Sequence, residues 1–402
     1  MGQRAQQLRE GLFQYDIVIL TSLLWFMVLF IRFAYPPLFG TFQSLFGVSN
    51  SQTGLLFTLL MLGYASAQFP AGAAGDRFGH TVVIFVGAVG FGVAALLTSL
   101  SPTFVFLLAT AVLFGIASGP HKGVTIPLLS DRYSENKGRA LGTVDTVGQF
   151  GGMVAPVAVV ALLSVFVWQA IFALAAIATI ALAVLFYIRV KRDTILSFQR
   201  AQRDDTESVD AALPEYIIVF RDWRLLLFIG VIVLQAFAWN ALAAFFPLYL
   251  SEEKGFTGGM AGILFSLLFV VSISQAVTGE LSDRVGQLRI TLVLFAGMAV
   301  GLGALVVSTS IPILLVTTIV LGISFHGIRP VRDSYLMELI PTQLGGGTLG
   351  LIRTIMTGIG ALGPVVMGYS ADIAGFDVAF VLITVITATG GVFSAVLLAT
   401  TK

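Results

Sequence analysis

Twelve stretches of this sequence are long and apolar enough to cross a lipid bilayer as helices, and they limit the fold more than any other feature. A span needs about 20 mostly apolar residues. Breaks at Gly, Pro and charge clusters divide the chain into segments of that length. We place them near 15–36, 52–74, 82–99, 103–129, 140–163, 166–188, 223–248, 258–280, 288–308, 311–337, 346–369 and 377–399.

Composition supports a lipid environment and excludes several classes of function. Of the 402 residues 57% are hydrophobic and 11% charged, whereas soluble proteins carry about one quarter charged residues. The net charge of +1 gives no reason to expect a nucleic-acid partner. The absence of cysteine excludes disulfides and thiolate metal sites. His80, His121 and His326 show no metal-ligand spacing. We therefore expect neither an enzyme nor a cofactor.

The N-terminal segment resembles a signal peptide, with Arg4 and Arg9 before an apolar run from Ile17 to Ile31. No small-x-small cleavage site follows it, because Arg32 and a Tyr-Pro-Pro sequence come next. We interpret this run as a retained first span.

The distribution of Lys and Arg predicts the orientation. If the N-terminus lies inside, 16 of the 22 basic residues fall in inner segments and five fall within spans. Lys254 is then the one basic residue in an outer loop. Because inner loops of membrane proteins are enriched in Lys and Arg, we predict a multi-pass protein of the cell membrane with both termini in the cytoplasm.

A polar segment near 190–222 is the one sizeable hydrophilic stretch, and it separates six spans from six. The predicted domains are an N-terminal bundle at 1–189, a cytoplasmic linker at 190–222 and a C-terminal bundle at 223–402.

The two halves repeat at an offset near 207 residues. Gly72-Ala-Ala-Gly-Asp-Arg-Phe-Gly79 matches Gly279-Glu-Leu-Ser-Asp-Arg-Val-Gly286. Gln68 matches Gln275, and Lys122 matches Arg329. Such internal duplication is typical of transporters built from two related bundles.

Taken together, these residues resemble the major facilitator superfamily. Its hallmark is G-x-x-x-D-R/K-x-G-R/K-R/K between spans two and three, with a weaker copy between spans eight and nine, and both positions are filled here. His80 and Thr81 replace the last two basic residues, which implies a weaker contact with lipid phosphate. The resemblance covers essentially the whole chain. It implies an all-α integral membrane fold of twelve transmembrane helices in two pseudo-symmetric six-helix bundles, working as a monomer by alternating access.

The two loop motifs predict gating residues. Glycines at their starts allow close helix approach, and glycines at their ends allow a tight turn. In the family the motif's carboxylates meet helix N-termini of the opposite half and latch the cytoplasmic side, and its arginines would pair with acids at the inner ends of spans four and ten. The alternative is a generic tight turn with a solvated Asp-Arg pair. The candidate gating residues of the two loops are Gly72, Asp76, Arg77, Gly79, Asp131, Gly279, Asp283, Arg284, Gly286 and Glu338.

Two cations occupy equivalent depths in spans four and ten. Lys122 and Arg329 each precede the acid at the inner end of the span by nine residues, or about 13 Å of helix. We interpret them as an anion clamp flanked by His121 and His326. In the alternative interpretation, Arg329 pairs with Asp333 and Lys122 reaches the inner surface.

Further charges lie within other spans. Arg32 lies in the outer part of the first span, where it either binds substrate or reaches the outer interface. Asp145 and Arg353 occupy duplicate positions and, with Arg332 and Asp333, are interpreted as gate or packing charges, with a salt bridge between Asp145 and Arg353 across the halves. The alternative role is proton carriage by Asp145, Asp333 or a histidine.

Cations within spans outnumber acids five to two, and an ionisable residue within a span is a functional candidate by default. We therefore predict a small organic or inorganic anion, such as a carboxylate, as substrate, together with a coupling proton or an exchanged anion. Proton-coupled efflux of hydrophobic drugs and transport of a neutral sugar remain alternatives. The predicted hydrogen-bonding residues of the site are Gln68, Gln275, Tyr64 and Asn240.

Overall fold

The computed structural model describes residues 15–133, 136–197, 219–340 and 345–400, and within these ranges the protein is helical without strands. The first half contains α2 (Asp16–Ala34), η1 (Pro36–Leu38), α3 (Phe39–Phe46), α4 (Asn50–Phe78), α5 (His80–Ser99), α6 (Phe104–Ser118), α7 (Pro120–Arg132), α8 (Lys137–Leu163) and α9 (Trp168–Ser197). The second half contains η4 (Val219–Arg221), α11 (Trp223–Glu252), α12 (Gly258–Val270), η5 (Val271–Ile273), α13 (Ser274–Val285), α14 (Gln287–Val307), α15 (Ile311–Leu339), α16 (Gly345–Gly360), α17 (Gly363–Ala374) and α18 (Phe376–Thr400).

The predicted spans are confirmed. Eleven helical segments of the described chain are long and apolar enough to cross a membrane, and a twelfth is α4 if its two parts, bent near Pro70, are counted as one span. Several spans consist of two helices. Span four breaks into α6 and α7 at Gly119-Pro120, and span eleven breaks into α16 and α17 before Gly363-Pro364. A Gly-Pro pair lies at each break, and proline lacks the N–H that would continue the helical hydrogen bonds.

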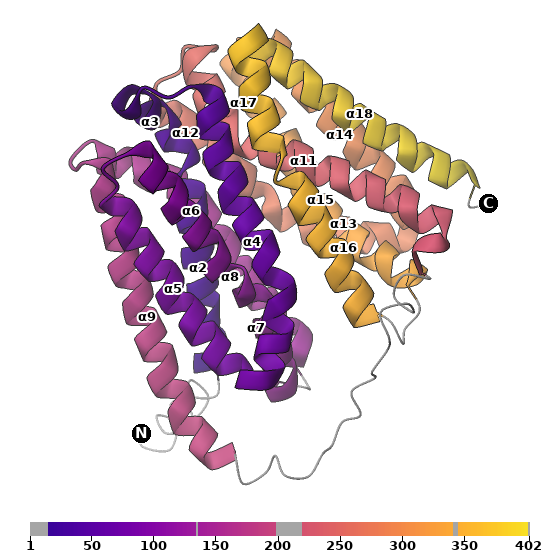
Figure 1. Cartoon of the computed structure of the whole chain (residues 1–402). Coiled ribbons are helices and arrows are strands. Elements are labelled where there is room, and N and C mark those ends of the chain that lie inside the picture. Colours follow the sequence, from indigo (N-terminus) through magenta and orange to yellow (C-terminus); the bar gives the residue numbers. More distant parts are fainter. Residues whose placement is uncertain (1–14, 134–135, 198–218, 341–344, 401–402) are drawn as a thin grey trace, which may run out of the picture.

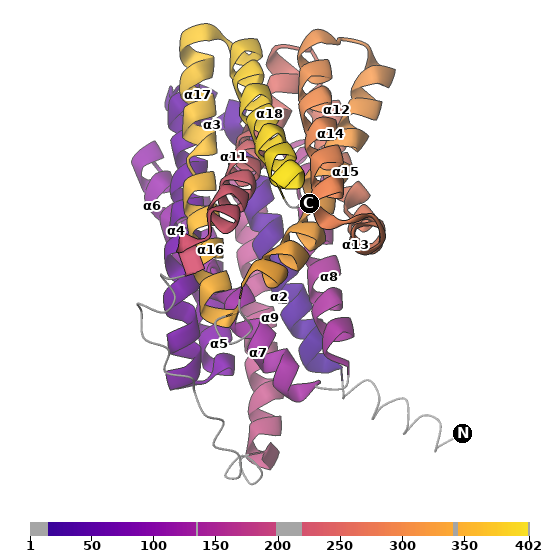
Figure 2. The same cartoon turned by 90° about the vertical axis from the view of Figure 1, so that its right-hand side faces the viewer.

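The helices form two groups that lean against each other (Figures 1 and 2). Helices α2 to α9 make one group, in indigo to magenta, and α11 to α18 make the other, in red to yellow. Helix α4 packs against α16 and α17 of the other group, and α8 packs against α12. The two bundles therefore meet along α4 and α8.

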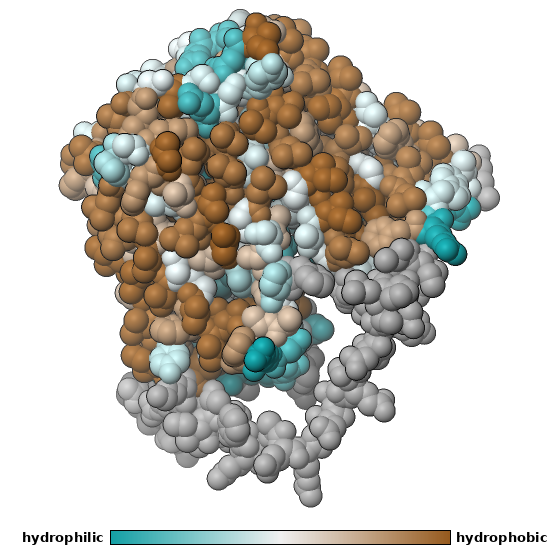
Figure 3. All heavy atoms as spheres, viewed as in Figure 1, coloured by the Kyte–Doolittle hydropathy of each residue, from teal (hydrophilic) through white to brown (hydrophobic). Residues whose placement is uncertain are grey.

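Apolar side chains cover most of the outer surface (Figure 3). Val105, Val300 and Val307, for example, are each more than 70% exposed. Hydrophilic residues gather toward the two ends of the molecule (Figure 3). Large exposed apolar surfaces mark contact with something other than water, and here the band matches helices of bilayer length.

One end of the molecule, where α4 begins and α17 ends, joins the two bundles directly; we call it the closed face. Asp372 of α17 accepts hydrogen bonds from the backbone N–H groups of Asn50 at 3.0 Å and Ser51 at 2.8 Å, and from the Ser51 hydroxyl. A carboxylate at a helix N-terminus satisfies unpaired N–H groups and complements the helix dipole. Asp372 thus ties α17 to the start of α4.

Close backbone packing extends this contact below the closed face. A Cβ on Gly54 would lie 2.3 Å from the carbonyl oxygen of Pro364, and one on Gly368 would lie 2.2 Å from that of Asn50. Glycine is therefore required where α4 and α17 cross.

The closed-face segment repeats the spacing of the two loop motifs. Gly368-x-x-x-Asp372-x-x-Gly375 has the same glycine and aspartate positions as the loop after Gly72. Its last glycine has a φ of 83°, similar to 88° at Gly79 and 105° at Gly286. This third copy, which was not among the predicted motifs, lies at the opposite end of the molecule from the other two.

The proposed division at 1–189, 190–222 and 223–402 remains a prediction. Helix α9 continues to Ser197, beyond the predicted end of its span. Residues 1–14 and 198–218, which hold the predicted N-terminal basic residues and most of the predicted linker, lie outside the described residues.

Packing within the first bundle generates a stability prediction. A Cβ on Gly151 would lie 2.2 Å from the carbonyl oxygen of Phe26, whereas one on Gly303 would meet no atom within 4 Å. We expect Gly151→Ala to lower stability by about 1 to 3 kcal/mol through overpacking, and Gly303→Ala to leave it unchanged or raise it slightly. Thermal unfolding in detergent measures both, and equal melting temperatures for the two variants would contradict the packing.

Candidate functional site

A cavity of about 1030 Å³ lies between the two bundles and reaches the end opposite the closed face. Asp76 at the end of α4 and Gly350 near the start of α16 line its mouth. The other lining residues come from α2, α4, α5, α7 and α8 of the first bundle and from α11, α13, α15 and α16 of the second. The cavity is therefore central, shared by both halves and open on one side.

Arg32 lies in the cavity wall and is 7% exposed. Its guanidinium carbon is 4.1 Å from the centre of the Tyr64 ring, a cation–π contact. Its Nε and Nη2 atoms are buried and have no hydrogen-bond partner. Two donor atoms left unsatisfied on a buried cation are costly.

The alternative in which Arg32 reaches the outer interface is wrong. The expected helix end at Pro36 is followed by η1 and α3, so that the first span extends from Asp16 to Phe46. This continuation places Arg32 deeper in the protein than the distance to the prolines indicated.

Lys122 and Arg329 both line the cavity but differ in their partners. The Lys122 ammonium lies 3.1 Å from a carboxylate oxygen of Asp145 and 5.9 Å from the centre of the Trp25 ring. Arg329 forms no ion pair with any residue that the structure describes. Of the two cations at duplicate positions, Lys122 is therefore in an ion pair and Arg329 is not, among the described residues.

Neither alternative for these two cations is realised. Lys122 is held by Asp145 within the cavity instead of reaching the surface. Asp333 does not pair with Arg329, because its Oδ1 accepts from Arg332 Nε at 2.9 Å and its Oδ2 from Arg353 Nη2 at 3.2 Å. Both carboxylate oxygens are already occupied.

Hydrogen-bonding side chains surround the cations. Gln68, Gln275, Tyr64 and Asn240 all line the cavity. The Gln68 Nε2 group is buried without a partner, whereas Asn240 Nδ2 donates to the Ala236 carbonyl at 2.9 Å.

The sequence analysis missed two further glutamines in the lining, Gln149 and Gln235. Gln235 precedes Trp239 by one helical turn, so both side chains lie on one face of α11. The spacing of Gln235 and Trp239 in the sequence could therefore have predicted that Gln235 lines the same site as Trp239.

The expectation that His121 and His326 flank the clamp requires correction, because neither lines the cavity. His121 Nε2 lies 3.1 Å from the Thr21 carbonyl oxygen, and its ring stacks on Trp25 at 5.7 Å. His326 is fully buried behind Trp239, with ring centres 4.9 Å apart. His121 lies in α7 directly before Lys122, and adjacent residues of a helix point in different directions.

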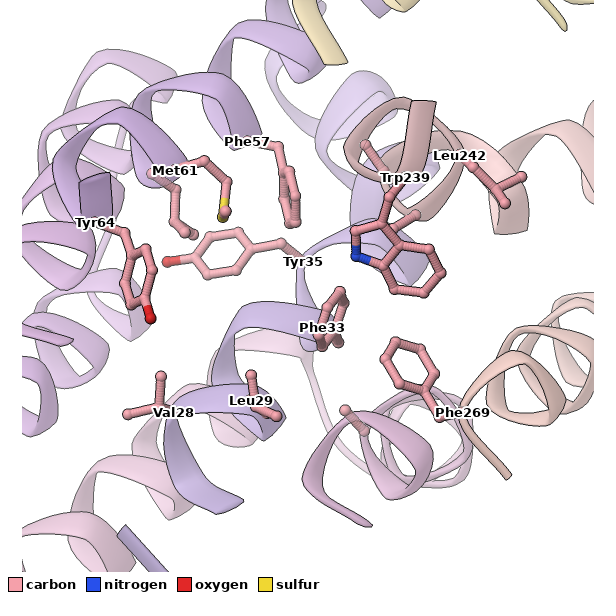
Figure 4. Close-up of a cluster of buried hydrophobic side chains, with 14 of the residues drawn as sticks. Val28, Leu29, Phe33, Tyr35, Phe57, Met61, Tyr64, Trp239, Leu242 and Phe269 are labelled. Carbon is pink, nitrogen blue, oxygen red and sulfur yellow. The ribbon is translucent and has the colours of Figure 1, made fainter. Parts of the chain in front are cut away.

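Aromatic residues of both bundles meet at the cavity wall, where Phe33, Trp239 and Phe269 point toward one another (Figure 4). Phe33 lies 4.6 Å from Phe269, 6.2 Å from Phe265 and 6.5 Å from Trp239, measured between ring centres. Since Phe33 follows Arg32 directly, this part of the cavity wall is both cationic and aromatic.

The loop motifs lie at the open side but do not form the predicted arginine pairs. Gly72 and Asp76 line the mouth, and Asp76 lies 3.7 Å from His80 one turn along the chain. Arg77 forms no ion pair with Asp131 among the described residues, and its guanidinium lies 5.3 Å from the Phe78 ring.

In the second loop, Arg284 pairs with Glu280 one turn earlier. Glu338 accepts a hydrogen bond from Gln287 instead of pairing with Arg284. The residues of this loop and of the acids opposite it, among them Gly279, Asp283 and Gly286, remain gating candidates by prediction.

The predicted salt bridge between Asp145 and Arg353 is also not formed. Asp145 pairs with Lys122 inside the first bundle and Arg353 with Asp333 inside the second. The cavity separates the bundles at this depth, so each charge finds its partner within its own half.

A family model and several known proteins match most of this chain. The family model described as Major Facilitator Superfamily matches residues 21–274 and 228–402. A hexuronate transporter of Bacillus subtilis is 24% identical over 358 residues, 83% of each chain. A probable sulfoacetate transporter of Cupriavidus necator is 25% identical over 365 residues, 84% of this chain and 82% of that one.

Solved structures with this fold include a bacterial homologue of the human lysosomal transporter Spinster, in an inward-facing, occupied conformation. It superimposes with a TM-score of 0.80 at 15% identity and covers 97% of both chains. At that identity the match supports the fold alone.

The unpaired state of Arg32 predicts a stability effect. We expect Arg32→Met to raise the stability of the ligand-free protein by about 1 to 3 kcal/mol, because it removes a buried, unsatisfied cation. Lys254 is the matched control: its side chain is 5% exposed, but its ammonium donates to the Val306 carbonyl at 2.6 Å and lies 4.0 Å from Asp377. Lys254→Met should therefore lower stability. Thermal unfolding in detergent measures both, and a lower melting temperature for Arg32→Met would contradict the assignment.

Proposed function

The chain belongs to the Major Facilitator Superfamily, and from this premise we propose that it is a secondary transporter that moves a small organic anion by alternating access. The observation that carries the substrate class is Arg32, a buried cation in the central cavity with two unsatisfied donors. Arg329, from the other bundle, is the second cation without an ion pair among the described residues.

Charge explains why an anion suits this cavity. Buried ions need an opposite charge and hydrogen bonds to offset desolvation, and charged residues within membrane spans mark substrate pathways. An anion reaching Arg32 and Arg329 would satisfy both cations and connect the two bundles. Relatives named as transporters of hexuronate and sulfoacetate, both organic anions, support this substrate class.

The surrounding amides favour a hydroxylated organic anion over an inorganic one. Gln68, Gln235, Gln275 and Asn240 bring donors and acceptors from both bundles to the cavity, and such groups recognise hydroxyl groups of a ligand. A neutral sugar would use the same amides but would leave the cations unsatisfied.

We infer that the open side faces the cytoplasm. Of the Lys and Arg residues that the structure describes, most belong to the end where α2 begins and the cavity opens, as the positive-inside rule requires. The structure then represents an inward-open state, and the contacts of Asp372 with α4 hold the outer side shut.

Uptake by proteoliposomes tests the proposed substrate class. We expect uptake of one or more sugar acids, and we expect Arg32→Gln and Arg329→Gln to reduce it about a hundredfold, since each removes a charge that contacts the substrate. Arg289→Gln is the matched control, because Arg289 is exposed, lies outside the cavity lining and donates to the Val285 carbonyl. Wild-type uptake in both cavity variants, or uptake restricted to neutral sugars or lipophilic cations, would refute the proposal.

A reversible crosslink tests alternating access. The chain contains no cysteine, and the side chains of Ser51 and Asp372 are in direct contact across the bundles. We expect oxidation of the double variant Ser51→Cys, Asp372→Cys to lock the closed face and stop uptake, and a reducing agent to restore it.

Each single variant under the same oxidant is the control, and neither should lose activity on oxidation. Continued uptake by a fully crosslinked double variant would show that the closed face does not need to open.

A further inference from the structure

The internal duplication places a pair of charged residues at the same positions in both bundles, but with one sign reversed. Lys122 corresponds to Arg329, and Asp145 corresponds to Arg353. In the first bundle the cation of α7 meets an acid of α8 at 3.1 Å. In the second bundle the position of that acid, on α16, is a cation. All four residues line the cavity.

This reversal decides which cations are available to a ligand. Asp145 pairs with Lys122 at 3.1 Å, so the pair as a whole has no net charge. Arg329 has no acid at the duplicate position. The two acids close enough to act on its charge are already engaged, Asp145 by Lys122, and Asp333 by Arg332 through one oxygen and by Arg353 through the other. Arg353 thus occupies the oxygen through which Asp333 could neutralise Arg329 one helical turn away.

Asp76 is the third acid in the cavity lining, after Asp145 and Asp333. It lies at the cavity mouth, next to His80. Among the described lining residues, the cations without an acidic partner are Arg32 and Arg329, one from each bundle.

We propose that the duplicate positions 145 and 353 determine the charge of the anion that this protein accepts. Asp145 withdraws Lys122 from the substrate, and Arg353 keeps Arg329 available by holding Asp333. Both residues act through another side chain and are therefore positioning residues. This inference rests on the proposed function, because it assigns the charge selectivity of the same site.

The first test releases Lys122. Asp145→Asn should raise the affinity for D-glucarate, with two carboxylates, relative to D-gluconate, with one, by about tenfold, because an added cation attracts the more highly charged ligand more strongly. The double variant Lys122→Gln, Asp145→Asn should return this ratio to the wild-type value. Asp145→Glu, which keeps the ion pair, should leave the ratio unchanged. An unchanged ratio in Asp145→Asn, or a raised ratio that persists in the double variant, would overturn the proposal.

The second test uses rescue. Arg353→Gln frees an oxygen of Asp333 for Arg329 and should lower the affinity for both ligands about tenfold. Adding Asp333→Asn to this variant should restore the affinity, because Arg329 is again without an acid. A direct contact of Arg353 with the ligand, or a structural role for it, predicts no rescue, and that result would refute its role as a positioning residue.

A probe that needs no substrate separates failure of this inference from failure of the proposed function. Trp25 and Trp239 line the cavity, whereas the other two tryptophans, Trp168 and Trp223, do not. With Trp168 and Trp223 replaced by Phe in every protein compared, quenching of tryptophan fluorescence by iodide reports its entry into the cavity. We expect stronger iodide quenching in Asp145→Asn and weaker quenching in Arg353→Gln, with quenching by neutral acrylamide unchanged. If the iodide results hold but neither sugar acid binds the wild type, the proposed function fails and the charge assignment stands. If the wild type binds a sugar acid but iodide quenching is the same in all variants, the charge assignment fails.

Discussion

Hydrocarbon offers no hydrogen bond to a backbone group and no solvation to a charge, and this constraint organises the whole protein. Every span is helical, so that its backbone groups pair internally. Valine-rich faces such as those around Val300 and Val307 point outward, while the Lys, Arg and Asp residues in the middle of the described spans line the cavity. The cavity is therefore where a charge within a span avoids contact with hydrocarbon. Most of the charged side chains there have an oppositely charged partner. Among the described residues Arg32 and Arg329 are the exceptions, and the Nε and Nη2 atoms of Arg32 are buried without a hydrogen-bond partner.

The two ends of the molecule are held in different ways. At the closed face a carboxylate caps a helix of the other bundle, and glycines let α4 and α17 touch along their backbones. Below it, Phe33, Trp239 and Phe269 join the bundles through apolar contact alone. At the open side the charges pair within their own bundle instead. The bundles are thus joined across their boundary at one end, whereas at the other end each bundle pairs its own charges, and the proposed alternating access would exchange these two conditions.

The internal duplication gives the two bundles the same helical framework, and differences between the copies change how the charges of the cavity are paired. A perfectly symmetric protein would pair Arg329 with an acid as it pairs Lys122 with Asp145. The arginine at position 353 prevents this and engages Asp333. Arg32 adds a second asymmetry, since the seventh span has Trp239 and Asn240 near the equivalent depth. The cationic side of the cavity thus arises where the halves differ.

The sequence by itself determined the helical spans, their number and the internal duplication. Whether an apolar run can span the bilayer depends on its own length, which does not require knowledge of tertiary contacts. It also identified Arg32, Lys122 and Arg329 as unusual, because a charge in such a run stands out without knowledge of its neighbours. Only the tertiary structure decided which charges are paired. Lys122 with Asp145 and Arg353 with Asp333 replaced the predicted partners, because the open cavity separates the bundles at that depth. The depth of Arg32 depended on a helix continuing past two prolines, and the burial of His326 depended on Trp239 covering it. The contact of Asp372 with Asn50 joins residues 322 positions apart, and a distance of that kind is set by how the bundles lean together.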